Sequence, residues 1–239
     1  MGVFSRLGRV VSLLSGLLLL APLAGALTLS EVRTEARTLA LDSGSTRQRF
    51  ADARLTAWAN EGQRQAVIEA RPILKAGAFS LSAGSTYYTL PSDFLQMSRV
   101  TLDYALLPEK TPEMLDDETP GWQDDVSTSN PTNFYIDFSS RTLMGMHPVP
   151  TTTSGIVRYE YYAQASALSA DGDTPFNSIT ELIPYHYLLA YFTAARMAAI
   201  DGKASLATFY MAEFKAGIER MKMEAKKRPA QRPLYGGMK

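Results

Sequence analysis

The chain has 239 residues, of which 46% are hydrophobic and 20% charged, and its 24 acidic side chains balance its 24 basic ones. These proportions are typical of a folded globular protein and exclude a disordered or fibrous one. Because the sequence has no cysteine, it excludes disulfide bonds, zinc–thiolate sites, a catalytic thiol and a lipid anchor on an N-terminal cysteine.

The neutral total conceals an uneven distribution of charge. Residues 100–175 carry 12 acidic and 3 basic side chains, a net charge of −9, whereas residues 196–239 carry 10 basic and 4 acidic ones, a net charge of +6. Each segment alone is explained equally well by a solvated surface. Together, separate regions of opposite charge suit subunits that meet head to tail, or contacts with a charged partner.

Residues 1–26 have the pattern of an export signal. Arg6 and Arg9 precede an apolar run, residues 10–21, and the small residues at 24–26 are of the kind that a signal peptidase requires. The apolar run is shorter than the roughly 20 residues that cross a bilayer, and no later segment approaches that length. We therefore expect no membrane-spanning helix.

The folded domain is predicted to start at residue 27. Residues 28–31, Thr-Leu-Ser-Glu, match the capping box, in which a Thr and a Glu three residues later satisfy the first turn of a helix. Two explanations of the leader fit this junction. One is cleavage after Ala26; the other is an upstream extension of the gene model, with Leu27 encoded by a leucine codon that can initiate translation.

Two helices are predicted next, over residues 28–41 and 49–70. The first has apolar residues at helical spacing, and Pro72 ends the second. The inward stripe of the second helix consists of Leu55, Trp58, Ala59, Gly62 and Ala66.

The hydrophobic period then changes to two, which indicates a β region over about residues 78–163. Phe79 and Leu81 before an Ala-Gly turn, with Tyr88 and Leu90 after it, predict a β-hairpin. Further strands are expected in the segments 96–102, 133–138, 141–146 and 155–163. In the last of these, Tyr159 and Tyr161 alternate with charged residues, as in a sheet with one face exposed to solvent.

Residues 103–132 are rich in proline and acidic residues and show little periodicity. We predict that they cross the surface as an irregular excursion that contains Trp122.

Helical spacing returns after residue 176. It predicts helices over residues 181–200 and 204–227, separated by Asp201-Gly202. The inward residues expected in the second of these helices are Leu206, Phe209, Tyr210, Phe214, Ile218 and Met221. Residues 226–239 form a basic tail whose prolines and glycines cannot continue a helix.

These elements predict an α+β fold. We expect mainly an α-helical bundle of about four helices, with an inserted antiparallel β region and a flexible C-terminal arm. The unit would span residues 27–225, preceded by the leader 1–26 and followed by the tail 226–239.

The sequence offers few candidates for catalysis or metal binding. His147 and His186 are 39 residues apart and belong to no pair at helical spacing, which favours structural roles for both. Asp171 and Asp173 suit a turn better than a calcium loop, because further ligands at the required positions are missing. The acidic run 116–118 suits a solvated loop. With no nucleophile elbow and no phosphate-binding glycine loop, we predict no catalytic residue, metal or cofactor.

Several longer segments of the sequence, taken in their order along the chain, resemble those of a known protein family. They are FADARLTAWANEGQRQ (50–65), YYTLPSDFLQMSRVTL (87–102), GW (121–122), NPTNFYIDFSSRTLMGMHPVP (130–150), VRYEYYAQASALSADGDTPF (157–176) and ITELIPYHYLLAYFTAAR (179–196). In this order and spacing the chain resembles the head-to-tail adaptor, or connector, proteins of tailed bacteriophages, over roughly residues 28–225.

The resemblance implies a structural virion protein at the head–tail junction, assembled in the host cytoplasm. Family members form a ring, commonly of twelve copies, that docks on the portal and gives the tail or nozzle protein its platform, with DNA only as passing cargo. In several members the C-terminal arm enters the portal assembly. The residues of the tail that we expect to dock on the portal are Lys226, Lys227, Arg228, Arg232 and Tyr235.

The leader departs from the family pattern, because export would remove a virion protein from the compartment where it assembles. The resemblance therefore favours an extended gene start over a working signal. The alternative function is a secreted or periplasmic α+β binding module that holds a ligand with the aromatic strands around Tyr159 and Tyr161. An exported hydrolase has the least support, since no nucleophile is paired with a base.

Overall fold

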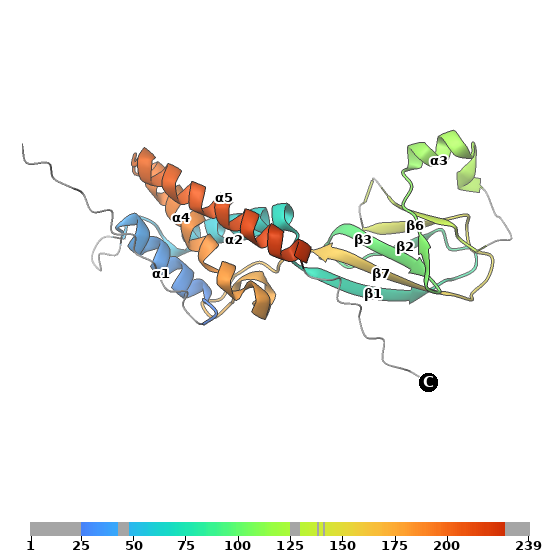
Figure 1. The fold of residues 1–239 in the computed structure, drawn as a ribbon, viewed down its shortest axis with the longest axis horizontal. Coiled ribbons are helices and arrows are strands. Elements are labelled where there is room, and N and C mark those ends of the chain that lie inside the picture. Colours follow the sequence, from blue (N-terminus) through green and yellow to red (C-terminus); the bar gives the residue numbers. More distant parts are fainter. Residues whose placement is uncertain (1–24, 43–47, 125–129, 138, 141, 228–239) are drawn as a thin grey trace, which may run out of the picture.

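The computed structural model describes residues 25–42, 48–124, 130–137, 139, 140 and 142–227. Within these residues the fold is α+β, with five α-helices and two antiparallel sheets, so the predicted class is confirmed. Figure 1 shows an elongated molecule, in which four of the helices lie at one end and the sheets and helix α3 at the other. The predicted leader up to residue 24, and the tail from residue 228, lie outside the described residues.

Helix α4 lies at the centre of the helical end. The four helices here are α1 (Leu29–Ala40), α2 (Asp52–Ala70), α4 (Tyr187–Ile200) and α5 (Ala204–Lys227), and α4 contacts the other three. Two glycines allow close approach to it. A Cβ added to Gly62 of α2 would lie 2.9 Å from the Phe192 ring, and one added to Gly217 of α5 would lie 2.1 Å from a Leu188 methyl. Side chains of α4 thus fill the space that these glycines leave.

The capping box at the start of α1 is confirmed. The Thr28 hydroxyl accepts a hydrogen bond from the Glu31 amide at 3.4 Å, and the Glu31 carboxylate accepts one from the Thr28 amide at 2.7 Å. Two of the amides that a helix N-terminus leaves unpaired are satisfied in this way. The helix ends at Leu41, whose φ of 59° lies in the left-handed region.

The helix expected over residues 181–200 starts later than predicted. Residues Thr180–Tyr185 form the 3-10 helix η3, preceded by η2 (Pro175–Ser178), and α4 starts only at Tyr187. Pro184 lacks an amide hydrogen and its ring crowds the preceding turn, so an α-helix cannot run through this segment undisturbed.

Seven strands form two antiparallel sheets. The four-stranded sheet has the order β1-β7-β3-β4, and the three-stranded sheet has the order β2-β6-β5. Their bounds are β1 (Leu74–Ser80), β2 (Tyr87–Thr89), β3 (Phe94–Leu102), β4 (Ala105–Leu107), β5 (Asn133–Ile136), β6 (Leu143–His147) and β7 (Ile156–Ala163). The β region therefore begins at Leu74, earlier than the expected residue 78.

The predicted hairpin around the Ala83-Gly84 turn is wrong. Strand β1 pairs with β7, and β2 pairs with β6 in the other sheet, so the two strands are not hydrogen-bonded to each other. Phe79 and Tyr88 nevertheless face each other, with their rings stacked at 4.2 Å between centroids. The chain crosses from one sheet to the other at this turn, and the two aromatic residues meet across the sheets.

One hydrophobic core joins the two ends of the molecule. Along β7 the side chains of Val157, Tyr159, Tyr161 and Ala163 are buried and those between them are not, which confirms the predicted alternation. These residues belong to the same cluster as Phe214 of α5. The sheets are therefore anchored to the helices through a continuous core.

The described residues between 103 and 124 are more ordered than predicted. They contain β4, the α-helix α3 (Pro112–Glu118) and the 3-10 helix η1 (Trp122–Asp124). The Thr111 hydroxyl caps α3 by accepting a hydrogen bond from the Met114 amide at 3.3 Å, and Pro112 occupies the first turn, where its missing amide costs nothing. Trp122 is buried, with 6% of its surface exposed.

Among the helices of the described residues, none is both long enough and apolar enough to span a membrane.

Candidate assembly surfaces

Both histidines lie in the interior of the protein. The His147 ring meets the Trp122 ring edge-on at 5.9 Å, and His186 is fully buried beside Phe176. Burial lowers the pKa of His186, because the interior disfavours the charged imidazolium. Across the described part of the chain, no three His, Asp or Glu side chains lie where they could hold a metal ion together.

Asp171 and Asp173 lie in a loop that holds the start of α1. The backbone carbonyl of Asp173 accepts a hydrogen bond from the Leu29 amide at 2.7 Å, and the Asp171 carboxylate pairs with Arg33. The Asp173 carboxylate accepts the amides of Ser169 and Ala170, and these hydrogen bonds lower its pKa. The loop is therefore a structural turn against α1, as the sequence favoured.

Helix α3 carries an exposed acidic surface at the far end of the sheets. Leu115 is buried beneath the helix, and Glu113, Met114 and Asp117 lie on its opposite side. We call these three residues the α3 face. Met114 is 48% exposed, so the face combines two carboxylates with one apolar side chain.

A buried aromatic cluster fixes α3 in place. The Trp122 indole donates a hydrogen bond to Asp116 of α3 at 2.7 Å, and its ring meets the Tyr135 ring edge-on at 5.0 Å. Lys110 forms an ion pair with Glu118 at the other end of the helix. The orientation of the α3 face is thus set by contacts to the sheet and not by α3 alone.

Helix α5 has an outer surface that no other described element covers. Its inward side chains, among them Tyr210, Phe214 and Ile218, are buried. The outward ones include four apolar residues, Phe209, Ala212, Ala216 and Met223, and beside them the basic Lys215, Lys222 and Lys226; we call these seven residues the α5 outer face. The exposed Glu219 lies among them and forms an ion pair with Lys222.

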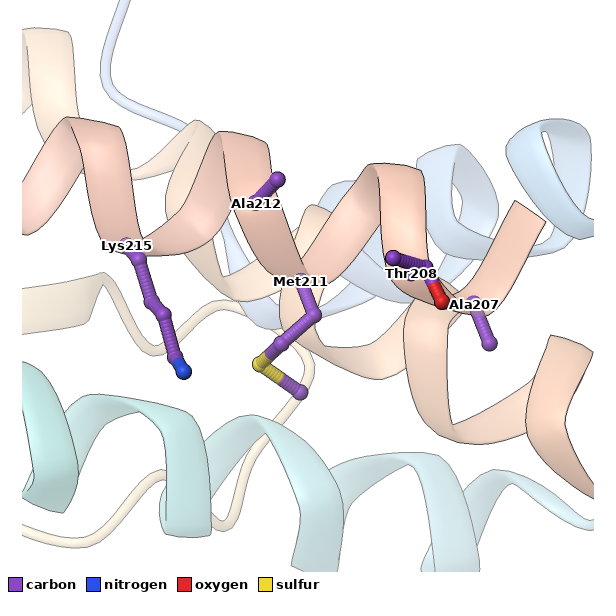
Figure 2. A pocket seen from close by; sticks show the side chains of 5 residues that line it. All are labelled: Ala207, Thr208, Met211, Ala212 and Lys215. Atoms are coloured by element: carbon purple, nitrogen blue, oxygen red, sulfur yellow. The ribbon is translucent and has the colours of Figure 1, made fainter. Parts of the chain in front are cut away.

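A shallow groove of about 420 Å³ lies along the first half of α5. It is lined by Ala207, Thr208, Met211, Ala212 and Lys215. In Figure 2 the side chains of Met211 and Lys215 leave the helix on the same side, whereas Ala212 points away from them. The lining has one hydroxyl and one ammonium group among apolar side chains, so the groove suits a packing contact better than a small polar substrate.

Two of the five residues predicted to dock on the portal lie within the described residues. Lys226 and Lys227 are exposed and belong to the last turn of α5, where cations interact favourably with the helix dipole. Arg228, Arg232 and Tyr235 fall outside the described residues.

Phe209 was predicted to face the core, and this prediction is wrong. Phe209 is 54% exposed, whereas its neighbour Tyr210 is 8% exposed and donates a hydrogen bond to the Leu39 carbonyl. Tyr210, Phe214 and Ile218 recur every four residues and form one stripe, whereas Phe209 lies about 100° round the helix from Tyr210, outside that stripe. The spacing in the sequence therefore favours a surface position for Phe209.

Comparison with protein-family models gives a match over most of the chain. The model described as SU10 adaptor protein matches residues 27–236. The match starts at Leu27, which is 8% exposed and is the first residue of the hydrophobic core, and it continues past the end of α5. A comparison with curated proteins gives no match.

Proposed function

Because the chain belongs to the SU10 adaptor protein family, a family of phage head-to-tail adaptors, we propose that it forms a ring that docks on the portal and provides the platform for the tail. The observation that carries this proposal is the family match over residues 27–236. The protein would then be a virion component with a structural role. Helices α1, α2, α4 and α5 would form the bundle of each subunit, and the sheets would extend from it. The ring would contain twelve copies, as the resemblance implies.

The surfaces of the molecule support assembly in a ring. The acidic α3 face and the basic α5 outer face lie on different parts of an elongated molecule (Figure 1). When two different surfaces of identical subunits meet, each subunit is rotated relative to its neighbour by a fixed angle. The subunits close into a ring when a whole number of these rotations makes 360°. Contacts between exposed charges are screened over about 8 Å at physiological ionic strength, so a ring held this way should weaken with salt.

The partners in the virion would be further copies of the chain, the portal protein, and a tail or nozzle protein. The C-terminal tail, from Lys226, would contact the portal. DNA would pass through the ring channel as cargo.

The exported binding module has less support. Its ligand site was expected around Tyr159 and Tyr161, but these residues are only 8% and 4% exposed. Tyr161 donates a hydrogen bond to Asp93, and burial together with this carboxylate raises its pKa to about 12. Both rings fill the core and are not free to hold a ligand.

Electron microscopy and native mass spectrometry of the full chain, alone and mixed with the portal protein of the same virus, would test the proposal. We expect a closed ring, formed either alone or only on the portal, since many ring proteins close only on their partner. Raising the salt concentration should reduce the ring population. A monomer under both conditions would contradict the proposed function.

A further inference from the structure

We propose that the α3 face of one copy packs on the α5 outer face of the next copy. This inference rests on the proposed ring and deepens it, because it names the two surfaces that meet. It makes the subunit contact heterologous, with acidic groups on one side and basic groups on the other.

The charges of the two faces are complementary and available. Glu113 and Asp117 are exposed, and among the described residues neither has an ion-pair partner. On the α5 outer face, Lys215 and Lys226 are likewise exposed and unpaired within the part of the chain that the structure describes. The two carboxylates lie four residues apart, or about 6 Å along the axis of α3, whereas Lys215 and Lys226 lie eleven residues apart, or about 16 Å along α5. The two long lysine side chains would therefore have to reach the carboxylates from opposite ends of the contact.

The apolar groups of the two faces also suit each other. Met114 is 48% exposed and lies beside Glu113, about 100° round the helix from it. On α5, Ala212 and Ala216 are small, exposed and one turn apart, so they form a shallow seat. A flexible thioether side chain adapts well to such a seat. Phe209, which is 54% exposed and lies three residues before Ala212, would be covered at one end of the contact.

Symmetric pairing of either face with itself is disfavoured. Two α5 outer faces would bring the unpaired Lys215 and Lys226 against like charges, and two α3 faces would oppose carboxylates. Contact within one copy is also excluded, because α3 and α5 lie at different ends of the molecule (Figure 1). The complementary pairing is therefore the α3 face of one copy with the α5 outer face of another.

Cysteine cross-linking tests this contact, because the natural chain has no cysteine and each introduced thiol is unique. The variants are Met114→Cys and Ala212→Cys in the full chain, both at exposed positions, treated with a short bifunctional maleimide with and without portal. We expect the mixture of the two variants to give a cross-linked dimer that contains one of each. Each variant alone should give only background. Circular dichroism would verify that both variants fold.

A matched control places the thiol on another exposed site, Thr152→Cys, in the loop before β7. Mixed with Ala212→Cys, it should give only background. Cross-linking of Ala212→Cys with itself would overturn the inference in favour of a symmetric contact. A ring that forms without the Met114–Ala212 cross-link would overturn the inference and leave the proposed function standing, whereas the absence of any ring on the portal would contradict both.

Charge reversal gives a second measurement on the same contact. The double variant Glu113→Lys/Asp117→Lys and the double variant Lys215→Glu/Lys226→Glu should each weaken self-association about tenfold or more at low salt, because attraction becomes repulsion. A chain that carries all four changes should recover association, since the charges are again complementary. If the four-fold variant associated no better than the double variants, the pairing of these faces would be refuted.

Discussion

The Nδ1 atom of His186 lies 3.3 Å from the backbone carbonyl oxygen of Leu27, and it ties the first residue of the core to the segment that enters α4. The ring is fully buried, and its Nε2 atom has no hydrogen-bond partner among the described residues. The imidazole is therefore neutral in the folded protein, with the proton on Nδ1 donated to Leu27. A second proton on Nε2 would be an unpaired buried charge.

This geometry predicts a loss of stability in mild acid. Burial lowers the pKa of His186 in the folded state from its ordinary value of 6.5, so below about pH 6.5 the unfolded state binds a proton that the folded state does not. The free energy of unfolding should fall as the pH drops from 7 towards 5. Chemical denaturation at several pH values would measure it. The variant His186→Gln, which can keep a donor towards Leu27 but cannot titrate, should remove most of this slope; an unchanged slope would show that another group is responsible.

A second prediction concerns the close contact between β5 and β6. A Cβ added to Gly145 would lie 2.0 Å from the ring of Tyr135, which is only 2% exposed and has no room to move. Gly145→Ala should therefore destabilise the fold by about 1–3 kcal/mol, the usual cost of overpacking. Gly172→Ala is the control, because a Cβ there meets nothing within 4 Å. Thermal unfolding would compare them, and equal melting temperatures would contradict the argument.

A third prediction compares two arginines of α1. Arg37 is buried and bonds Asp42 at 2.9 Å, Asp52 at 2.7 Å and the Phe50 carbonyl at 2.7 Å. The side chain of Asp42 is only 2% exposed, and Arg37→Ala would remove its shortest ion pair and leave it with the Arg49 amide at 3.2 Å and the Arg49 guanidinium at 3.8 Å. We expect a loss of about 3–5 kcal/mol, as for other broken buried pairs.

Arg33→Ala is the matched control for this comparison. The partner of Arg33, Asp171, is 78% exposed, and such pairs contribute roughly 0–1 kcal/mol. Denaturant titrations of both variants measure the difference. Similar losses would show that burial of the pair does not determine its contribution.

The parts of the fold that depend on neighbouring residues could be predicted from the sequence. The capping box at Thr28 and Glu31 involves four residues, and its signature is complete in the sequence. The alternation of buried and less buried side chains along β7 can likewise be predicted from the sequence of that strand alone. Strand partners could not be predicted, because they lie far apart in the sequence. Phe79, for example, lies opposite Val157 in its sheet, and the residues around Phe79 do not indicate this partner.

The candidate surfaces could be predicted only in outline. The uneven charge of the sequence indicated two regions of opposite sign, but not that α3 exists as a helix that exposes Met114 beside two carboxylates. Trp122 fixes this helix through Asp116 and packs on Tyr135, and those contacts depend on the second sheet. The exposure of Phe209 could have been predicted from a helical wheel, whereas the orientation of α3 could not.

A fourth prediction concerns the N-terminus of the working protein, which we expect at residue 27 or 28. The core begins at Leu27, α1 is capped by Thr28, and the family match starts at residue 27. Mass spectrometry of the protein from virions would identify the terminus. A methionine in place of Leu27 would indicate internal initiation, and Leu27 itself would indicate cleavage. A virion protein with its leader intact would contradict the prediction.

The last prediction concerns the tail. The family match continues to residue 236, past the end of α5 at Lys227, so the family pattern includes Tyr235. The described core ends earlier, with Met221 as its last buried residue. Deleting residues 226–239 should therefore leave the free energy of unfolding almost unchanged and should abolish binding to the portal. Tyrosine is favoured at interface hot spots because it supplies a large contact area at low entropic cost, so Tyr235→Ala should weaken portal binding by about 2 kcal/mol.

Two controls separate docking from folding in this experiment. Tyr235→Phe keeps the ring and should retain most of the affinity, and denaturant titration of the deleted chain would report its stability directly. Portal binding, measured by titration of labelled portal, should also weaken for Arg232→Ala if the basic groups contribute. A deleted chain that bound the portal with unaltered affinity would refute the docking role of the tail. One that no longer folded would show that the residues from Lys226 onwards belong to the core.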